Sequence, residues 1–355
     1  MIAPVPHLAA MAPYALADLG PPGTVSLAQN ESAFPPSPKA VQAGQTALAQ
    51  AALYPDPDWS ELRAAISAVH GVDRDRILCG AGSMELISAL VQAYAPAGST
   101  VLGSALGYAF VATAAAQVQA RYLTVPEPNL HIDPAQIART VTEDTRIVFV
   151  CNPGNPTGTR VSGAEIVALR EALPGHVLLV VDQAYGEFAD AADPPAPVFD
   201  LISRGDTVIT RTFSKAYGLA GARVGWALAP LTVGAEMRKL LNPNNVSGVS
   251  QAMATAAMRD QDHMRDVVRQ TTALREGFAR SARALGIEVP DSHTNFVLLR
   301  FASGAQAARV DQALRSAGLL LRAMGGYGLP EALRATVVAK PHLDRVLAVL
   351  QKEMS

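Results

Sequence analysis

The chain has 355 residues, of which 49% are hydrophobic and 17% are charged, and its formal net charge is −2. This balance is typical of an enzyme with a large core, and the length predicts more than one domain. No apolar run approaches the roughly 20 residues of a membrane span, so we expect no membrane insertion. No basic block offers a surface to nucleic acid, so we expect no nucleic-acid binding. The two cysteines, Cys79 and Cys151, are too few for a disulfide framework and are interpreted as buried free thiols.

Residues 1–40 are rich in proline and alanine. The prolines of NESAFPPSP exclude a long helix or a central strand, so we predict an N-terminal arm that packs with the smaller domain. This arm has no Lys or Arg before its apolar part, unlike a secretory signal, and we therefore expect a cytoplasmic protein. Two helical patterns follow between Val41 and His70. They flank LYPDPDW, whose prolines predict an extended turn that displays Tyr54 and Trp59.

Short apolar runs then alternate with helical patterns. The runs predicted as buried strands are RILCG, STVLGSALGYAF, ARYLTVP, RIVFVCNP, HVLLVVDQAY and TVITRTFS, and VATAAAQV and SGAEIVALREAL are predicted helices. This alternation predicts a mostly parallel sheet, covered on both faces, in a large domain over residues 41–245. Such sheets bind ligands at the carboxyl ends of their strands. The candidate residues at these ends are Tyr108, Asn152, Asn155, Asp182, Tyr185 and Lys215.

The pattern changes beyond residue 245. One long helical region extends through Leu285, and it is followed by the run FVLLRF, a helix near residues 305–316, the runs LLLRAM and ALRATVV, and a terminal helix. Helices that alternate with short strands indicate a smaller α/β domain over residues 246–355.

The stretch RTFSKAYGLAGARVGW, at residues 211–226, carries the strongest chemical signal. Lys215 lies just past the predicted strand TVIT, among small and apolar residues. Burial lowers the pKa of an amine and makes it competent to form a Schiff base with an aldehyde. Thr212, Ser214 and Arg223 lie close enough in sequence to hold a phosphate. Together these features predict a site for pyridoxal phosphate, and the alternative is a surface lysine in a glycine-rich loop.

Asp182 ends the apolar run HVLLVV, where a carboxylate is costly unless it has a partner. A protonated pyridine nitrogen is such a partner, and keeping that nitrogen charged makes the cofactor an electron sink. Tyr185 and Asn155 are candidates to donate hydrogen bonds to the phenolate oxygen of the cofactor. The alternatives are a helix or turn cap for Asp182 and a turn-former among prolines for Asn155.

Two further features predict anion binding. The turn GAGSM leads into a helix that begins near Ser83, and its backbone N–H groups can bind a phosphate, although a tight structural turn explains it equally well. Arg322 lies in LLLRAM, and Arg334 lies where the loop YGLP enters a strand. Guanidinium groups in apolar settings usually bind carboxylate or phosphate, so one of them can hold a substrate carboxylate. The alternative is an internal ion pair with an Asp or Glu.

These residues lie in segments that resemble the pyridoxal-phosphate aminotransferases of the aspartate aminotransferase fold, and within them the histidinol-phosphate aminotransferase group. The resemblance spans nearly the whole chain. The matching segments are NE at 30–31, YPDP at 54–57, GAGSMELI, NPGNPTGT, VVDQAYGEF, RTFSKAYGLAGARVGW, TNFVLLR and MGGYGLPEALRATV. The resemblance implies an α/β fold of type I, with a mostly parallel sheet in the large domain and a smaller α/β domain, and a homodimer with shared active sites.

The resemblance also implies a role for each matching residue. Lys215 would form the Schiff base with pyridoxal 5'-phosphate, and Asp182 would pair with its pyridine nitrogen. Tyr185 and Asn155 would face the phenolate oxygen, and Tyr108 would stack on the ring. The residues implied to bind the cofactor phosphate are Thr212, Ser214, Arg223, the backbone amides of Ser83 and Met84, and Tyr54 from a second subunit. The residues implied to bind the substrate are Arg334, Arg322, Tyr14 and Asn30, and no metal site is expected.

Some positions depart from the pattern of the group. Met84 stands where an aspartate is usual, Gln183 replaces a glutamate, the arm reads NESAFPPSP, and ATVVAKPHL replaces an IGTxEEN-like sequence. These changes leave the cofactor residues intact but touch the rim that selects the substrate. The resemblance therefore implies transfer of an amino group from histidinol phosphate or an amino acid to a 2-oxo acid such as 2-oxoglutarate, in amino-acid biosynthesis.

Three alternatives stay open for the function. An aromatic amino-acid aminotransferase would keep the chemistry and change the side-chain pocket. A decarboxylase of the threonine-phosphate decarboxylase type would break a different bond at Cα, with release of carbon dioxide. A regulator that keeps the cofactor domain as a sensor would carry an added DNA-binding segment, and we expect no room for one in this chain.

Overall fold

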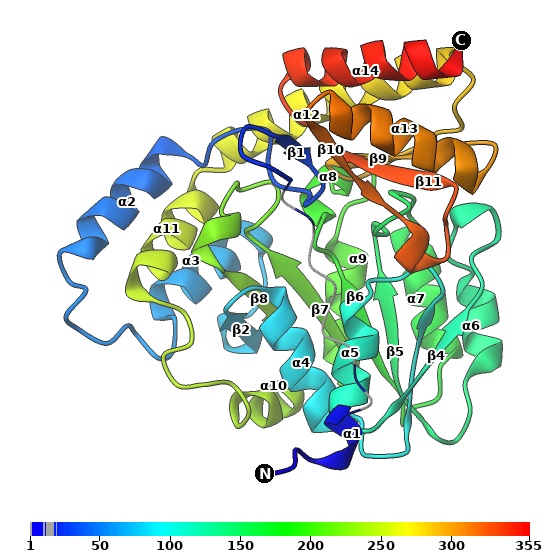
Figure 1. The fold of residues 1–355 in the computed structure, drawn as a ribbon. Helices are drawn as coiled ribbons and strands as arrows, with labels where there is room; N and C mark the ends of the chain where they lie inside the picture. Colours follow the sequence, from blue (N-terminus) through cyan, green and yellow to red (C-terminus); the bar gives the residue numbers. More distant parts are fainter. Residues whose placement is uncertain (1, 10, 12–17, 19) are drawn as a thin grey trace.

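The computed structural model describes residues 2–9, 11, 18 and 20–355. Within these residues the chain forms two β-sheets, each packed against helices, and Figure 1 shows the two units one above the other. We call the sheets the large sheet and the small sheet. In this part of the chain, no helix is both long enough and apolar enough to cross a membrane.

The large sheet has the strand order β2-β8-β7-β6-β5-β3-β4. Its strands are β2 (Ile77–Gly80), β3 (Thr100–Ser104), β4 (Arg121–Val125), β5 (Thr145–Cys151), β6 (Leu178–Asp182), β7 (Thr207–Thr212) and β8 (Gly225–Leu228). The strands from β7 to β4 pair in parallel, whereas β8 runs antiparallel to both of its neighbours. Every side chain of β6 and β7 is buried, which requires cover on both faces because successive side chains point to opposite sides. The prediction of a mostly parallel, covered sheet is confirmed.

Three details of the large sheet differ from the sequence-based expectation. The glycine-rich pattern of residues 211–226 does not predict β8, whose first residue, Gly225, lies so close to the backbone of Ser83 that a Cβ would collide with it. The run STVLGSALGYAF ends as a strand at Ser104, because the chain turns there, with the N–H of Gly107 bonded to the backbone oxygen of Ser104 at 3.0 Å, and Phe110 then begins the next helix. The expectation of burial is wrong for β4, which is an edge strand with mostly exposed side chains.

Helices surround the large sheet and form its main hydrophobic core with it. They are α2 (Pro38–Leu48), α3 (Ser60–His70), α4 (Ser83–Tyr94), α5 (Phe110–Gln117), α6 (Pro134–Thr140), α7 (Gly163–Ala172), α9 (Ala196–Phe199), α10 (Leu231–Arg238) and α11 (Gly248–Arg259). The short helix α8 (Gly186–Ala189) instead packs Phe188 in a separate cluster with Tyr185, Ala216 and Phe296, and α1 (Pro6–Ala9) lies near the N-terminus without buried residues. The predicted helices on either side of the turn LYPDPDW are α2 and α3, and α4 begins at Ser83 as predicted. The turn displays Tyr54 as expected, but the prediction is wrong for Trp59, whose ring is covered by Arg238 and which is 3% exposed. In Figure 1, α2, α3 and α11 lie together at the left of the molecule.

The small sheet has the order β1-β10-β11-β9. Its strands are β1 (Val25–Leu27), β9 (Phe296–Arg300), β10 (Leu319–Ala323) and β11 (Ala332–Thr336), and its helices are α12 (Gln261–Ala284), α13 (Gly304–Ser316) and α14 (Lys340–Met354). These elements share a second hydrophobic core. Strand β1 belongs to the N-terminal arm and pairs in parallel with β10 at the edge of the sheet, a position that agrees with the exclusion of a central strand.

The long helical region expected from about residue 245 through Leu285 is confirmed, and it consists of two helices, α11 and α12, which are divided at Asp260. The backbone of Asp260 is not helical, with φ −100° and ψ 61°. Its carboxylate accepts hydrogen bonds from the Ser37 hydroxyl at 2.5 Å and from the Lys39 amine at 2.7 Å. The break between the two helices is therefore held by the first residues of α2 and its cap.

Candidate active site

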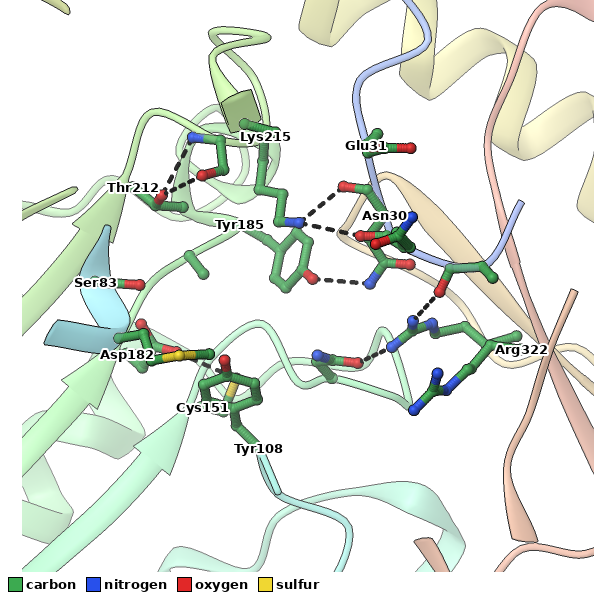
Figure 2. Close-up of a pocket in the computed structure, with 18 of the residues that line it drawn as sticks. Asn30, Glu31, Ser83, Tyr108, Cys151, Asp182, Tyr185, Thr212, Lys215 and Arg322 are labelled. Carbon is green, nitrogen blue, oxygen red and sulfur yellow. Dashed lines mark hydrogen bonds between the residues drawn. The ribbon is translucent and has the colours of Figure 1, made fainter. Parts of the chain in front are cut away.

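A cavity of about 460 Å³ lies at the carboxyl ends of β5, β6 and β7, and the small sheet and the N-terminal arm complete its wall (Figure 2). Its volume is in the range of small-molecule and cofactor sites. The predicted site residues that line it are Asn30, Ser83, Met84, Tyr108, Asn155, Asp182, Tyr185, Thr212, Ser214, Lys215, Arg223, Arg322 and Arg334. The tertiary structure thus brings together residues from segments that are far apart in the sequence.

Lys215 lies three residues beyond the end of β7, with its side chain directed into the cavity. Its Nζ donates a hydrogen bond to the backbone oxygen of Asn30 at 2.9 Å and lies 3.5 Å from that of Gln29. Burial is the main cause that lowers the pKa of Lys215 to about 8, and the positive charge of Arg334 lowers it further. The surface-lysine alternative is therefore wrong, because this amine lies in a cavity and is poised to lose its proton near neutral pH.

Asp182 is the last residue of β6, and its side chain is only 2% exposed. Its Oδ1 accepts a hydrogen bond from the hydroxyl of Thr210 at 2.7 Å, and its Oδ2 lies 3.9 Å from the Sγ of Cys151. Burial raises the pKa of Asp182 to about 6, although the bond from Thr210 opposes this rise. No helix begins at Asp182 among the described residues. The carboxylate is thus part of the cavity floor and not a helix cap.

Hydroxyl and guanidinium groups gather at the end of the cavity that adjoins α4. The Oγ1 of Thr212 donates to the Oγ of Ser214 at 3.0 Å, and the Nη1 of Arg223 approaches the same oxygen at 3.5 Å. Gly82 has φ 84°, and a Cβ at this position would collide with the guanidinium of Arg223. Because Gly82 leaves that space, Arg223 lies beside the first residue of α4, Ser83, whose backbone N–H has no acceptor within the helix. Such a helix start favours an anion.

Tyr185 and Asn155 lie on the wall between Lys215 and the small sheet. The phenol oxygen of Tyr185 accepts a hydrogen bond from the Nδ2 of Asn30 at 2.9 Å, and burial raises the pKa of Tyr185 above its ordinary value. The Oδ1 of Asn155 accepts a hydrogen bond from Arg334. Tyr108 lines the opposite side of the cavity, below Asp182 in Figure 2.

Arg322 and Arg334 are direct cross-strand partners, because β10 and β11 pair in antiparallel register at these two residues. Both line the cavity. Arg334 is 6% exposed and donates a hydrogen bond to the backbone oxygen of Ala28 at 2.8 Å, and its guanidinium carbon lies 5.3 Å from the ring centroid of Phe296. The small sheet therefore contributes two neighbouring guanidinium groups to one wall, a combination that suits an anionic ligand.

Three predicted residues are not part of this wall. The side-chain amide of Asn152 donates a hydrogen bond to the backbone oxygen of Val161 and accepts one from the backbone N–H of the same residue. Asn152 therefore holds the following loop and does not face the cavity. Tyr54 is 90% exposed and does not line the cavity of its own chain. Tyr14 lies outside the described residues.

The sequence does not indicate four residues that the structure adds to the site. Thr210 and Cys151 contact Asp182. The thiols of Cys151 and Cys79 are both free and buried, as expected. Glu31 lines the cavity beside Lys215. Asn295 donates to the backbone oxygens of Asn30 at 3.1 Å and Glu31 at 2.9 Å, which fixes this part of the arm. The segment TNFVLLR could have pointed to Asn295, since a polar residue directly precedes a buried strand there.

Known proteins resemble this chain both in sequence and in fold. A family model for aminotransferase class I and II matches residues 22–350. Histidinol-phosphate aminotransferase from Ruegeria pomeroyi is 42% identical over 318 residues, which cover 90% of this chain and 88% of that protein. A structure of histidinol-phosphate aminotransferase from Sinorhizobium meliloti in complex with pyridoxal-5'-phosphate is similar with a TM-score of 0.88 and 30% identity, over 93% of this chain and 90% of that one.

A mutant of Thermus thermophilus aspartate aminotransferase has the same fold. Its TM-score is 0.86 at 20% identity, and the match covers 99% of this chain and 100% of that one. The expected α/β fold of the aspartate aminotransferase type is thereby confirmed.

Proposed function

The chain belongs to the class I and II aminotransferase family, and we propose that it uses pyridoxal phosphate to move an amino group from histidinol phosphate to a 2-oxo acid such as 2-oxoglutarate. One observation carries the chemistry. One cavity is lined by a lysine amine of lowered pKa, by a buried carboxylate, and by a cluster of hydroxyl and guanidinium groups at the end that adjoins α4. These are the groups that an aldehyde, a pyridine nitrogen and a phosphate require.

The residues present fit pyridoxal phosphate at each of its functional groups. Asp182, ionised above pH about 6, would bind the protonated pyridine nitrogen, and burial of this carboxylate without a cationic partner is otherwise costly. Thr212, Ser214 and Arg223 would hold the phosphate, together with the backbone amides of Ser83 and Met84 at the start of α4. Tyr185 and Asn155 would face the phenolate oxygen, and Tyr108 would stack on the ring.

Lys215 would have two tasks in this site. When bound, pyridoxal phosphate supplies an aldehyde that condenses with amines and a ring that withdraws electrons from the substrate Cα. The Lys215 amine would hold the aldehyde carbon until the substrate amine replaces it. Lys215 would then act as general base and acid, because its lowered pKa lets it accept a proton from Cα and return it near neutral pH. The backbone oxygen of Asn30 would orient the amine for this transfer.

The substrate end of the cavity supports a donor with an anionic group. Arg322 and Arg334 would bind the phosphate of histidinol phosphate or the carboxylates of 2-oxoglutarate, and Asn30 lines the same cavity. The relative from Ruegeria pomeroyi, which this chain matches over 90% of its length, carries the name histidinol-phosphate aminotransferase. An aromatic amino acid is the second candidate donor, since its carboxylate would need only one of the two arginines.

The proposed assembly is a homodimer that shares its active sites. Tyr54 supports it, because a tyrosine that is 90% exposed on the chain and absent from its own cavity is available to the phosphate site of a second copy.

We further propose residues 1–40 as an arm that packs with the small unit, which the pairing of β1 with β10 supports. We place the boundary of the large unit after α11, near residue 260 and not 245, because α11 packs against α2 and α3. A cytoplasmic location stays a prediction from the sequence.

The experiment that tests this function compares donors directly. The purified protein is mixed with 2-oxoglutarate and either histidinol phosphate or phenylalanine, and the glutamate formed is measured together with any carbon dioxide released. Glutamate formation from histidinol phosphate supports the proposal. Rapid turnover of phenylalanine without turnover of histidinol phosphate would favour the aromatic aminotransferase, and carbon dioxide without glutamate would favour the decarboxylase.

A further inference from the structure

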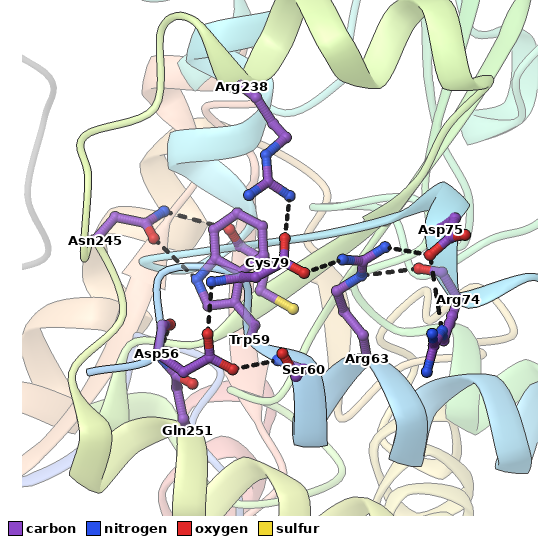
Figure 3. Close-up of polar contacts among 11 residues, drawn as sticks. Asp56, Trp59, Ser60, Arg63, Arg74, Asp75, Cys79, Arg238, Asn245 and Gln251 are labelled. Carbon is purple, nitrogen blue, oxygen red and sulfur yellow. Dashed lines mark hydrogen bonds and ion pairs between the residues drawn. The ribbon is translucent and has the colours of Figure 1, made fainter.

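A polar network behind the phosphate end of the cavity is centred on Asn245. Its Nδ2 donates to the Oε2 of Glu85 at 2.7 Å and to the backbone oxygen of Cys79 at 3.3 Å. Its Oδ1 accepts a hydrogen bond from the indole Nε1 of Trp59 at 3.1 Å, and Figure 3 shows Asn245 in contact with both Trp59 and Cys79. One amide side chain therefore joins strand β2, the start of α3 and the start of α4.

Glu85 connects this network to the turn that precedes α4. The same Oε2 that binds Asn245 accepts the backbone N–H of Ala81 at 2.6 Å. Gly82 caps the helix without a side-chain hydrogen bond. The next backbone N–H groups, those of Ser83 and Met84, are the ones assigned above to the cofactor phosphate. One carboxylate oxygen thus has two donors, one on the phosphate-binding turn and one on the Asn245 amide.

The Glu85 carboxylate and the cofactor phosphate would compete for the same helix end. The N-terminus of a helix attracts anions through its partial positive charge and its unpaired N–H groups. Glu85 lies in the first turn of α4 and borders a side cavity that shares Met84 and Arg223 with the main cavity. Without the Asn245 donor, this carboxylate would lose a partner that keeps it on Ala81 and could turn toward the phosphate donors, where it would repel the phosphate.

Trp59 extends the network to the loop that carries Tyr54. Its side chain is 3% exposed, and the guanidinium of Arg238 lies 4.9 Å from its ring centroid. Arg238 in turn donates to Asp58 at 2.6 Å. The segment that follows Tyr54 is thus fixed to the same amide that holds Glu85, as Figure 3 shows for Trp59, Arg238 and Asn245.

We propose that Asn245 is a positioning residue for the cofactor phosphate. It holds the Glu85 carboxylate away from the N–H groups of Ser83 and Met84, and through Trp59 it fastens this turn to the loop that presents Tyr54. Asn245 does not touch the cofactor in this role and acts through Glu85. The inference rests on the proposed function, because it requires that a phosphate binds at the start of α4.

The test compares two ligands that differ only in the phosphate. Pyridoxal phosphate and pyridoxal are titrated separately into the cofactor-free protein, and binding is followed by the change in absorbance. Asn245→Asp keeps the acceptor for Trp59 but replaces the donor to Glu85 with a second carboxylate. We expect the Kd for pyridoxal phosphate to rise about tenfold, the usual scale for loss of one hydrogen bond to a charged group, and the Kd for pyridoxal to stay unchanged.

A second substitution tests whether the loss acts through the Glu85 charge. Adding Glu85→Gln to Asn245→Asp removes the carboxylate that would turn toward the phosphate donors, while the Gln oxygen can still accept the N–H of Ala81. This double variant should recover the affinity for pyridoxal phosphate. Gln251→Ala is the matched control, because it removes hydrogen bonds to the backbone oxygens of Asp56 and Val246 and leaves Asn245 and Glu85 paired. It should leave the ratio of the two Kd values at that of the wild type.

Either of two results would overturn the role of Asn245. One is an equal loss of affinity for both ligands in Asn245→Asp, which would mean that the whole site is loosened. The other is failure of the double variant to restore the preference for pyridoxal phosphate over pyridoxal. A wild-type protein that binds pyridoxal phosphate no better than pyridoxal would instead refute the phosphate site on which the proposed function depends.

Discussion

The Nζ of Lys215 and the backbone oxygen of Asn30 are 2.9 Å apart and form a hydrogen bond across 185 positions of sequence. Lys215 follows a strand of the large sheet, whereas Asn30 lies in the arm that joins the small sheet. Asn30 also donates to the phenol oxygen of Tyr185 and pairs with the hydroxyl of Thr336 on β11. The position of the reactive amine therefore depends on contacts between the two units and not on its own loop alone.

Replacement of Lys215 should abolish amino transfer. We expect Lys215→Ala to reduce turnover at least about 10³-fold, because general acid–base catalysis by one side chain contributes roughly 10²–10⁴-fold and the covalent step is lost as well. Turnover is measured by glutamate formation, and borohydride reduction followed by mass spectrometry identifies the lysine that binds the cofactor in the wild type. Label on another lysine, or near-normal turnover of the variant at an unchanged Tm, would refute the assignment.

The lowered pKa of Lys215 predicts an unusual pH profile for cofactor uptake. The neutral amine reacts with an aldehyde, so the rate at which cofactor-free protein takes up pyridoxal phosphate should rise with pH and level off above about 8, not near the ordinary lysine value of 10.5. Stopped-flow absorbance at a series of pH values measures this rate.

Arg334 provides a check on the cause of that profile. Because its positive charge lowers the pKa of Lys215, Arg334→Gln should move the midpoint to higher pH, although burial remains the larger cause. Lys39→Ala, which removes an exposed surface amine, should leave the midpoint unchanged. A midpoint above 10 in the wild type would contradict the predicted burial of the amine.

Asp182 should cost stability in the cofactor-free protein. Its folded pKa of about 6 exceeds the ordinary value of 3.8, so it contributes stability that is fully present below pH 4 and is lost as the pH rises through 6. At pH 8, Asp182→Asn should therefore raise the free energy of unfolding by about 3 kcal/mol, and this gain should vanish near pH 4. The same variant should lose most of its turnover, since a neutral amide does not keep the pyridine nitrogen protonated.

Thermal denaturation of the cofactor-free variant at both pH values, together with its turnover, tests this trade-off. Thr210→Val serves as a second variant. It removes the hydrogen bond that favours the ionised Asp182 carboxylate, so it should raise the pKa of Asp182 further. Near-normal turnover of Asp182→Asn would mean that the carboxylate has only a structural role.

The two arginines should separate the candidate donors. With histidinol phosphate, which has no carboxylate, Arg322→Ala should weaken transition-state binding by roughly 2–4 kcal/mol, because a charge-assisted contact to the phosphate is lost. With phenylalanine, whose single carboxylate would bind Arg334, the substitution Arg322→Ala should matter far less than Arg334→Ala. The measurement is kcat/KM for both variants with both donors. Equal effects of the two substitutions on both donors would contradict this division of tasks.

The sequence by itself determined the local chemistry of this protein. A strand that ends in Asp182, a lysine three residues beyond another strand, and a glycine turn that opens a helix at Ser83 are all encoded by short patterns, because burial period, glycine and helix starts act over a few residues. The ordered motifs then indicated the family and the cofactor. The exposure of β4, the strand at Gly225–Leu228 and the break at Asp260 did not follow from these patterns, since each depends on which neighbour lies beside the segment.

Only the tertiary structure decided which side chains support these groups. Thr210 reaches Asp182 across 28 positions, Asn295 holds the oxygen of Asn30 across 265, and Asn245 meets Glu85 across 160. The hydrogen-bond partner of a polar residue cannot be identified from the sequence. Hydrophobic periodicity specifies the face of a helix or strand on which a residue lies, but it does not specify which elements are neighbours in the fold. The strand order of the large sheet and the pairing of β1 with β10 supply that missing relation.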